Sequence, residues 1–159
     1  MGHWSCVFCE LLRGVGPAVW LAREDGAAAL LPLPEGRLAS GHVLVISTEH
    51  AVGIQDVSEA GLRATVGLLQ RVAQGMGRAM GATGVNVLNA SGPHSDQSVP
   101  HLHFHVVPRW AGDGLDSWPS SKSSHVPADD WMLALRSAIS ASDWTRTQPP
   151  GVAIPTVAP

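Results

Sequence analysis

The stretch Pro100-His101-Leu102-His103-Phe104-His105-Val106-Val107-Pro108-Arg109 decides the fold of this 159-residue chain. Histidines alternate in it with apolar residues, which is the period of two that is typical of a half-buried β-strand. We therefore expect a strand over 101–107, with prolines at its two ends, where a strand tolerates them. Such a strand presents three imidazoles on one face, roughly 6.5–7 Å apart, and packs its other face into the core.

Three histidines on one strand face are compatible with two kinds of chemistry. They could bind a metal ion, since neutral imidazole is a common ligand. They could also attack and bind a phosphate group, because imidazole titrates near neutral pH. A purely structural role is the remaining interpretation. It is weaker when three histidines share one strand face than when only one or two do.

Composition and charge narrow the class of protein. The formal net charge is −3, so we expect no nucleic-acid partner. No apolar run reaches the 18 or more residues of a membrane span, and the amino-terminal residues do not resemble a signal peptide, so we expect a cytoplasmic protein. The length predicts a single domain over 1–145, followed by a proline-rich tail over 146–159 that we expect to be disordered.

The pattern along the chain predicts an α+β fold. We expect a hairpin with strands at 18–24 and 27–33, a buried strand over 43–47, and a strand over 84–89 before the histidine strand. A long helix should begin after Asp56 or Ser58 and end at Gly81. We expect one apolar stripe on it, formed by Leu62, Val66, Leu69, Ala73, Met76 and Met80. With a short helix over 130–141, the prediction is a mostly antiparallel five-stranded sheet with one long helix and one short carboxy-terminal helix.

Several motifs together resemble one known family. The run from His101 to Val107 matches the pattern His-x-His-x-His followed by two hydrophobic residues. Its flanks at 96–100 and 107–109, the Gly-His strand at 41–46 and the Cys-x-x-Cys motif at 6–9 fit the same family. Over roughly residues 4–118, the chain resembles the histidine triad superfamily of nucleotide hydrolases and transferases.

The resemblance implies nucleotidyl transfer at an α-phosphate. His103 would be the nucleophile and would form a nucleotidyl-phosphoramidate. His105 and His42 would donate hydrogen bonds to the non-bridging oxygens of the phosphate. Gln97 and Ser98 would contact the phosphate or the leaving-group oxygen. Because the histidines themselves bind the phosphate, a catalytic metal is not required.

The resemblance leaves the substrate open. Dinucleoside polyphosphates, nucleoside phosphoramidates and adenylylated small molecules all fit the expected chemistry. The alternative is a non-catalytic, zinc-stabilised protein that binds nucleotides without turning them over. A metalloenzyme with three histidine ligands is a third interpretation. Members of the family usually form homodimers through the long helix and an edge strand, so a homodimer is implied as well.

The Cys6-x-x-Cys9 motif has several interpretations. Alone it fits a redox motif, half of a zinc site, or two free thiols. Resemblance to the bacterial zinc-containing members implies that His50 and His101 complete a Cys₂His₂ site. Such a closed site would hold a structural zinc ion.

The chain departs from the family at two positions near the expected nucleotide. The acidic residue or Asn that binds the ribose hydroxyls falls on Pro34, or on Glu35 if the count is off by one. A loop position that is often Asn falls on Ala90. These departures imply weak recognition of the ribose.

Overall fold

The computed structural model describes residues 6–119 and 121–141, and the chain divides into two compact units between Ser117 and Trp118 in the sequence. The first unit holds a five-stranded sheet with helices α1 (Val7–Leu12) and α2 (Glu59–Met80), and the second holds α3 (Trp131–Ala141). Within the described residues, no helix has the length and hydrophobicity to cross a membrane. The expected tail over 146–159 lies outside the described residues, and the expected domain boundary at 145 stays a prediction.

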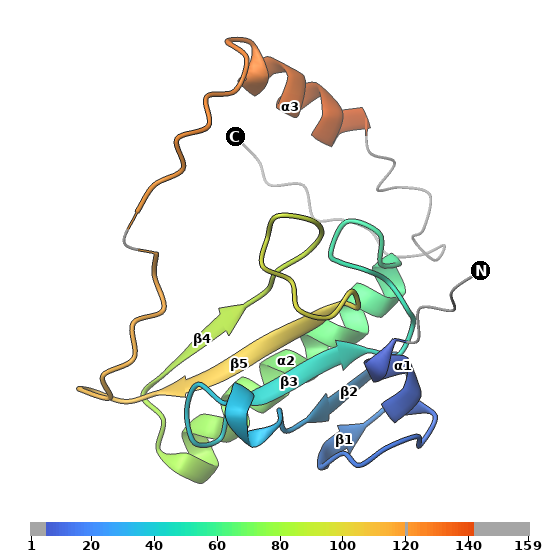
Figure 1. Cartoon of the computed structure of the whole chain (residues 1–159), viewed down its shortest axis with the longest axis vertical. Coiled ribbons are helices and arrows are strands. Elements are labelled where there is room, and N and C mark those ends of the chain that lie inside the picture. The colour runs from blue at the N-terminus through green and yellow to red at the C-terminus, as the bar shows by residue number, and fades with distance from the viewer. Residues whose placement is uncertain (1–5, 120, 142–159) are drawn as a thin grey trace, which may run out of the picture. The chain divides into compact units, whose positions relative to one another are not determined.

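The sheet is antiparallel throughout and has the strand order β1-β2-β3-β5-β4 (Figure 1). This arrangement confirms the predicted α+β class with five strands. The strand bounds are β1 (Trp20–Arg23), β2 (Ala27–Leu30), β3 (Val43–Ser47), β4 (Gly84–Leu88) and β5 (His103–Arg109).

Helix α2 covers one face of the sheet, behind the strands in Figure 1. It begins at the expected N-cap, Ser58, whose hydroxyl accepts a hydrogen bond from Gly61 N, and it ends at Gly81 in the left-handed conformation. Leu69, Ala73 and Met76 of the predicted stripe pack against the sheet, but the fully buried face is centred roughly a quarter turn to one side of the stripe. Val66, a member of that stripe, is 45 % exposed, and Met80 is exposed as well. The buried residues are Gly61, Thr65, Leu68 and Met76.

The turn between β1 and β2 packs directly on α2. Gly26 has a φ of +85°, and a Cβ at this position would lie 2.7 Å from the Ala64 Cβ. The β2 residues that face α2, Ala27 and Ala29, are also small and buried. Small residues therefore allow the helix to lie close to this edge of the sheet.

The opposite face of the sheet packs against α1, a helix that the sequence did not predict. Phe8 from α1 lies among Ala28, Leu30, Leu44 and Ile46, with Leu11 and Leu12 beside them. The helix has only six residues, and its N-cap residue, Cys6, makes no side-chain capping bond. A segment this short carries too little periodicity to be recognised from sequence.

Strand β5 begins two residues later than expected, at His103 instead of His101. It also continues through Pro108, which we expected to end it. Pairing with β3 stops at Val106, so Pro108 has only β4 as a neighbour, where it lies opposite Val85. No second ladder needs the N–H group that proline lacks.

Candidate functional site

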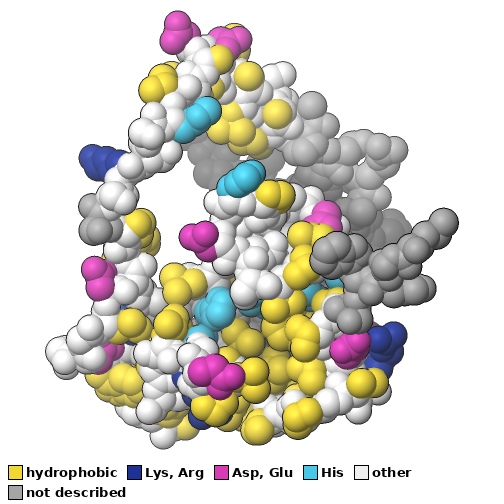
Figure 2. Space-filling model, viewed as in Figure 1, with side chains coloured by type: hydrophobic (Ala, Val, Ile, Leu, Met, Phe, Trp, Pro, Cys, Tyr) yellow, Lys and Arg dark blue, Asp and Glu magenta, His cyan; other side chains and the backbone are white. Residues whose placement is uncertain are grey.

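Two of the three expected histidines stand on the face of the sheet opposite α2. His103 pairs with Ile46 and His105 pairs with Leu44, and both partners belong to the cluster on the α1 face. His42 precedes Val43 and therefore shares the face of Leu44, since side chains alternate along a strand. Figure 2 shows histidine side chains in this part of the molecule, with hydrophobic side chains around them.

The backbone fixes the proton of His103. Its Nδ1 lies 2.7 Å from the carbonyl oxygen of His101. A carbonyl can only accept, so Nδ1 carries the hydrogen and the lone pair is on Nε2. The ring is 3 % exposed and contacts the Phe8 and His105 rings edge-on, with centroids 5.4 and 5.1 Å away. The His103 ring is therefore held in one orientation, with Nδ1 bonded to the backbone and Nε2 free of that bond.

A second chain of hydrogen bonds fixes the proton of His105. The Leu38 backbone N–H donates to His42 Nδ1 at 3.1 Å, so His42 carries its hydrogen on Nε2. That Nε2 lies 3.0 Å from His105 Nδ1, which must accept. His105 therefore carries its hydrogen on Nε2, the nitrogen that neither His42 nor the backbone occupies.

Both histidines of this pair are neutral near pH 7. Burial, and then the charge of Arg37, lowers the pKa of His42. Burial, followed by the neighbouring His103 and His42, lowers the pKa of His105 to about 4. The expectation that His42 donates to the phosphate does not fit this arrangement, because the residue is fully buried and both ring nitrogens already have partners.

Gln97 and Ser98 lie in the loop that leads into β5. The Gln97 side chain accepts from Gly92 N at 2.9 Å and donates to the Val52 carbonyl at 2.5 Å. It therefore joins two loops, the one before α2 and the one before β5. Ser98 is exposed.

The sequence prediction missed Asn89, which follows β4. Its side-chain amide donates to the His103 carbonyl at 2.8 Å, and its Oδ1 accepts from the Ser91 hydroxyl. Ser91 in turn accepts from Ile54 N. An Asn side chain thus lies one residue before Ala90, the position at which the sequence indicated that the family's loop Asn is missing. At the other departure, Pro34 opens an exposed 3₁₀ turn (Pro34–Gly36) that also contains Glu35, and weak ribose recognition stays a prediction.

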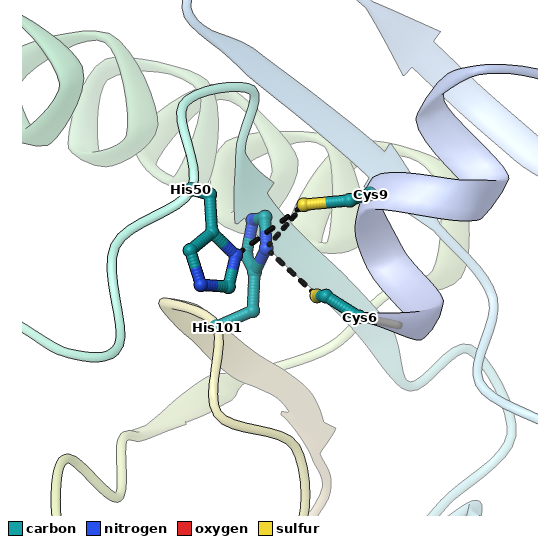
Figure 3. Close-up of side chains that lie close together, drawn as sticks. All are labelled: Cys6, Cys9, His50 and His101. Carbon is teal, nitrogen blue, oxygen red and sulfur yellow. Dashed lines mark hydrogen bonds between the residues drawn. The ribbon is translucent and has the colours of Figure 1, made fainter. Parts of the chain in front are cut away.

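A separate cluster of Cys6, Cys9, His50 and His101 lies beside the catalytic candidates (Figure 3). One ligand atom from each residue lies within 4.8 Å of the others. His101 Nδ1 is 3.3 Å from Cys6 Sγ and 3.6 Å from Cys9 Sγ, and His50 Nδ1 is 3.3 Å from Cys9 Sγ. Ordinary zinc–sulfur and zinc–nitrogen bonds at tetrahedral angles require separations of about 3.6 Å, so the four residues fit a zinc ion.

His101 belongs to this cluster and not to a row of three substrate-facing imidazoles. The residue is fully buried, and its Nε2 donates to the Ser47 carbonyl at 2.8 Å. This bond leaves Nδ1 unprotonated toward the cysteines, as a metal ligand requires. The Phe8 ring contacts both His101 and His103, so the two rings lie on the same side of the sheet. They differ in their partners, because His101 faces the cysteines and lies before the start of β5 at His103.

The chain resembles known proteins in both sequence and structure. Residues 34–112 match the HIT domain. The chain is 34 % identical over 122 residues to the adenosine 5'-monophosphoramidase hnt1 of Schizosaccharomyces pombe, covering 74 % of this chain and 87 % of that protein. It is 28 % identical over 117 residues to an adenylylsulfatase of Arabidopsis thaliana, covering 70 % and 58 %.

Solved structures share the fold. A zinc-bound histidine triad family protein from Mycobacterium smegmatis superposes with a TM-score of 0.66 at 32 % identity, covering 72 % of this chain and 82 % of that one. A protein from Streptococcus mutans superposes with a TM-score of 0.69 at 25 % identity, covering 87 % and 85 %. The chain belongs to the HIT-domain family, that of the histidine triad proteins.

Proposed function

We propose that this protein is a nucleotide hydrolase that forms a covalent nucleotidyl intermediate on His103. The single observation that carries the proposal is the hydrogen bond from His103 Nδ1 to the His101 carbonyl. It leaves an unprotonated Nε2 on a buried, oriented ring, which is what an imidazole nucleophile needs. The activities named for the relatives, hydrolysis of an adenosine phosphoramidate and of adenylyl sulfate, are of this chemical class.

The reaction has two displacements at the α-phosphorus. First, His103 Nε2 bonds to phosphorus while the bond between phosphorus and the leaving group breaks. The leaving group departs with the electron pair of that bond. The ring becomes cationic and its Nδ1–H donates more strongly to the His101 carbonyl, while a leaving amine takes a proton from water. Then water attacks phosphorus, the nucleoside monophosphate leaves, and the ring returns to its neutral form as the proton of the water passes to solvent.

His105 supports the charge that develops on phosphorus. Its Nε2–H is the donor that would meet a non-bridging phosphate oxygen. His42 acts through His105 and not on the phosphate itself: it is a positioning residue that holds His105 in the donating tautomer. Gln97 holds the adjoining loops together. Ser98, exposed at the approach to β5, is a candidate contact for the phosphate.

The charges around the site favour an amine leaving group. Residues 6–119 contain seven arginines and no lysine. Arg37 is the arginine whose charge reaches the histidine pair, whereas Arg71 and Arg109 pair with Glu24 and Asp113. A polyphosphate leaving group carries several negative charges, which neutral imidazoles compensate poorly. We therefore infer a nucleoside phosphoramidate as the substrate class, ahead of dinucleoside polyphosphates and adenylyl sulfate.

Cys6, Cys9, His50 and His101 would hold a zinc ion in a closed site. With four protein ligands, the ion has no open position for substrate and would supply structural support rather than a Lewis acid. Elemental analysis of the purified protein should give about one zinc per chain. Cys9→Ser should lose the metal and lower the melting temperature, so a zinc-free protein with unchanged stability would refute the site.

The test of the proposed reaction is turnover together with trapping of the intermediate. Adenosine phosphoramidate, diadenosine polyphosphates and adenylyl sulfate are supplied in parallel, and kcat/KM is measured for each. His103→Ala should lower turnover by at least ~10³-fold. Rapid quenching with an α-³²P-labelled substrate should leave label on the wild-type protein and none on the variant. Near-normal turnover in His103→Ala would contradict the assignment of His103 as the nucleophile.

A non-catalytic nucleotide-binding protein is the second candidate. The exposed side chains Leu33 and Leu38 flank the segment that leads to His42 and provide an apolar border suited to a base. If wild-type protein binds adenosine monophosphate but turns over none of the three substrates, this second function is the correct one.

A further inference from the structure

We propose that the metal-binding cluster positions the nucleophile through two residues, His101 and Phe8, in addition to stabilising the fold. The inference rests on the proposed role of His103. Contacts join the cluster to His103 by two separate paths.

The first path runs through the backbone of His101. Its ring is fixed at both nitrogens, by the cysteine sulfurs on Nδ1 and by the Ser47 carbonyl on Nε2. Its backbone N–H donates to the Val99 carbonyl at 2.8 Å. The remaining polar group, the carbonyl, accepts the hydrogen bond from His103 Nδ1. A metal ion bound at His101 Nδ1 would therefore help to fix the carbonyl that accepts from His103 Nδ1.

The second path runs through α1. Phe8 lies between the two cysteine ligands in sequence, and its ring is 6 % exposed. The ring meets His101 edge-on with centroids 5.6 Å apart at 83°, and it meets His103 at 5.4 Å and 64°. Phe8 is therefore a wall that limits rotation of the nucleophilic ring about its side-chain bonds.

The position of Phe8 depends on the ligands beside it. A helix of six residues is not stable by itself, and Cys6 supplies no side-chain cap. Apolar packing holds α1 on the sheet, but the thiols of Cys6 and Cys9 are the groups that fix its amino-terminal turn relative to His101. Loss of the metal would release this turn, and with it the Phe8 contact.

The consequence is a specific kinetic signature. A loosened His103 ring samples orientations in which Nε2 does not face phosphorus, so the chemical step slows. Binding of the substrate, which we assign mainly to His105 and the loops, should change little. Losing a supporting contact of this kind typically costs roughly ten- to hundredfold in rate.

The experiment compares two substitutions in α1 of the zinc-loaded protein. Phe8→Leu removes the rigid ring edge, and Val7→Ala, on the same helix at a side chain that is 45 % exposed, is the control. We expect Phe8→Leu to retain its zinc, to lower kcat at least tenfold and to leave KM within about twofold, while Val7→Ala behaves as wild type. If Phe8→Leu fails to fold, Phe8→Met keeps more of the buried volume and takes its place.

The second readout does not depend on turnover. In protein with ¹⁵N-labelled histidine, the His103 ring should show a single Nδ1–H tautomer in the zinc-loaded wild type and a mixture in Phe8→Leu. During chelation, its signals should change together with zinc loss and ahead of any loss of helix signal in circular dichroism. Wild-type ring signals in Phe8→Leu, or signals that follow only unfolding, would overturn the inference. If the wild type shows no turnover, the proposed reaction fails, but the ring signals still decide this question.

Discussion

At the scale of single residues, backbone groups decide which nitrogen of each histidine carries its hydrogen. The His101 carbonyl selects the Nδ1–H form of His103, and the Leu38 amide selects the Nε2–H form of His42 and, through it, of His105. This arrangement suits the proposed roles, in which His103 attacks phosphorus and His105 donates a hydrogen bond. Two chemically identical side chains thus carry their hydrogens on different ring nitrogens, because backbone groups fix the two tautomers differently.

Removing the Leu38 amide hydrogen should disturb this pair. Leu38→Pro deletes the donor, and Arg37 before it already has the extended conformation that proline requires of its predecessor. The hydrogen bond is worth about 1 kcal/mol, so we expect kcat/KM to fall roughly five- to tenfold. Leu38→Ala, which keeps the N–H, should retain the wild-type value. Equal activity in the two variants would contradict the assigned tautomers.

The lowered pKa of His105 predicts a dependence of stability on pH. The unfolded chain takes up this proton near pH 6.5, whereas the folded protein resists it down to about 4. Between these values the unfolded state binds more protons, so stability falls as the pH falls through this window. Above pH 6.5 neither state binds this proton, so the stability contribution of a neutral His105 is fully present there.

The measurement is the free energy of unfolding in urea at pH 7 and at pH 4.5, for wild type and for His105→Gln. The metal ligands titrate equally in both proteins, so the difference between them isolates His105. Wild type should lose more stability than the variant on acidification. A difference that does not change with pH would show that His105 is not held neutral.

At the scale of secondary-structure elements, close packing between α2 and the β1–β2 turn sets how the helix lies on the sheet. Gly26 and Ala64 meet where a larger side chain has no room. The Glu24–Arg71 ion pair joins the same turn to the helix about two helical turns after Ala64. Because both ion-pair side chains are substantially exposed, this pair adds little stability compared with the packing.

A double-mutant cycle measures this contact. Gly26→Ala places a Cβ at a φ of +85° and 2.7 Å from the Ala64 Cβ. We expect a loss of about 2–4 kcal/mol in the free energy of unfolding, from backbone strain and overpacking together. Ala64→Gly alone should cost about 1 kcal/mol. The two changes combined should cost less than their sum, and strict additivity would argue against the close contact.

At the scale of the whole molecule, two exposed valines, one on β4 and one on α2, are candidates for contact with a second copy of the chain. β4 is an edge strand, and Val87 on it is 45 % exposed. Val87 pairs with Val106 and so shares the α2 face of the sheet. Val66 projects from the side of α2 that is turned away from the β1–β2 contact at Ala64. These two residues are the surface through which we expect a second copy of the chain to bind.

Charge placed on this surface should prevent dimer formation. We expect wild type to sediment as a homodimer at micromolar concentration, and Val66→Glu with Val87→Lys to give a folded monomer. Leu21→Lys, at a side chain of similar exposure on the opposite edge strand β1, is the matched control and should remain dimeric. A stable wild-type monomer would refute the expectation.

Local pattern by itself predicted the strands and the long helix. The alternation from Leu102 to Val107, the N-cap at Ser58 and the glycine at Gly81 act within a few residues, so they can be recognised without the fold. The Cys-x-x-Cys motif and the histidine pattern, together with the family resemblance, identified the four residues of the metal cluster.

Tertiary structure decided what each histidine does. The sequence pattern treats His101, His103 and His105 as equivalent, yet one turns toward the cysteines, one bonds a carbonyl and one bonds His42. Partners 63 and 95 residues away in sequence make that distinction. The orientation of α2 and the role of Asn89 were decided in the same way, because burial and long-range hydrogen bonds exist only once the strands have paired.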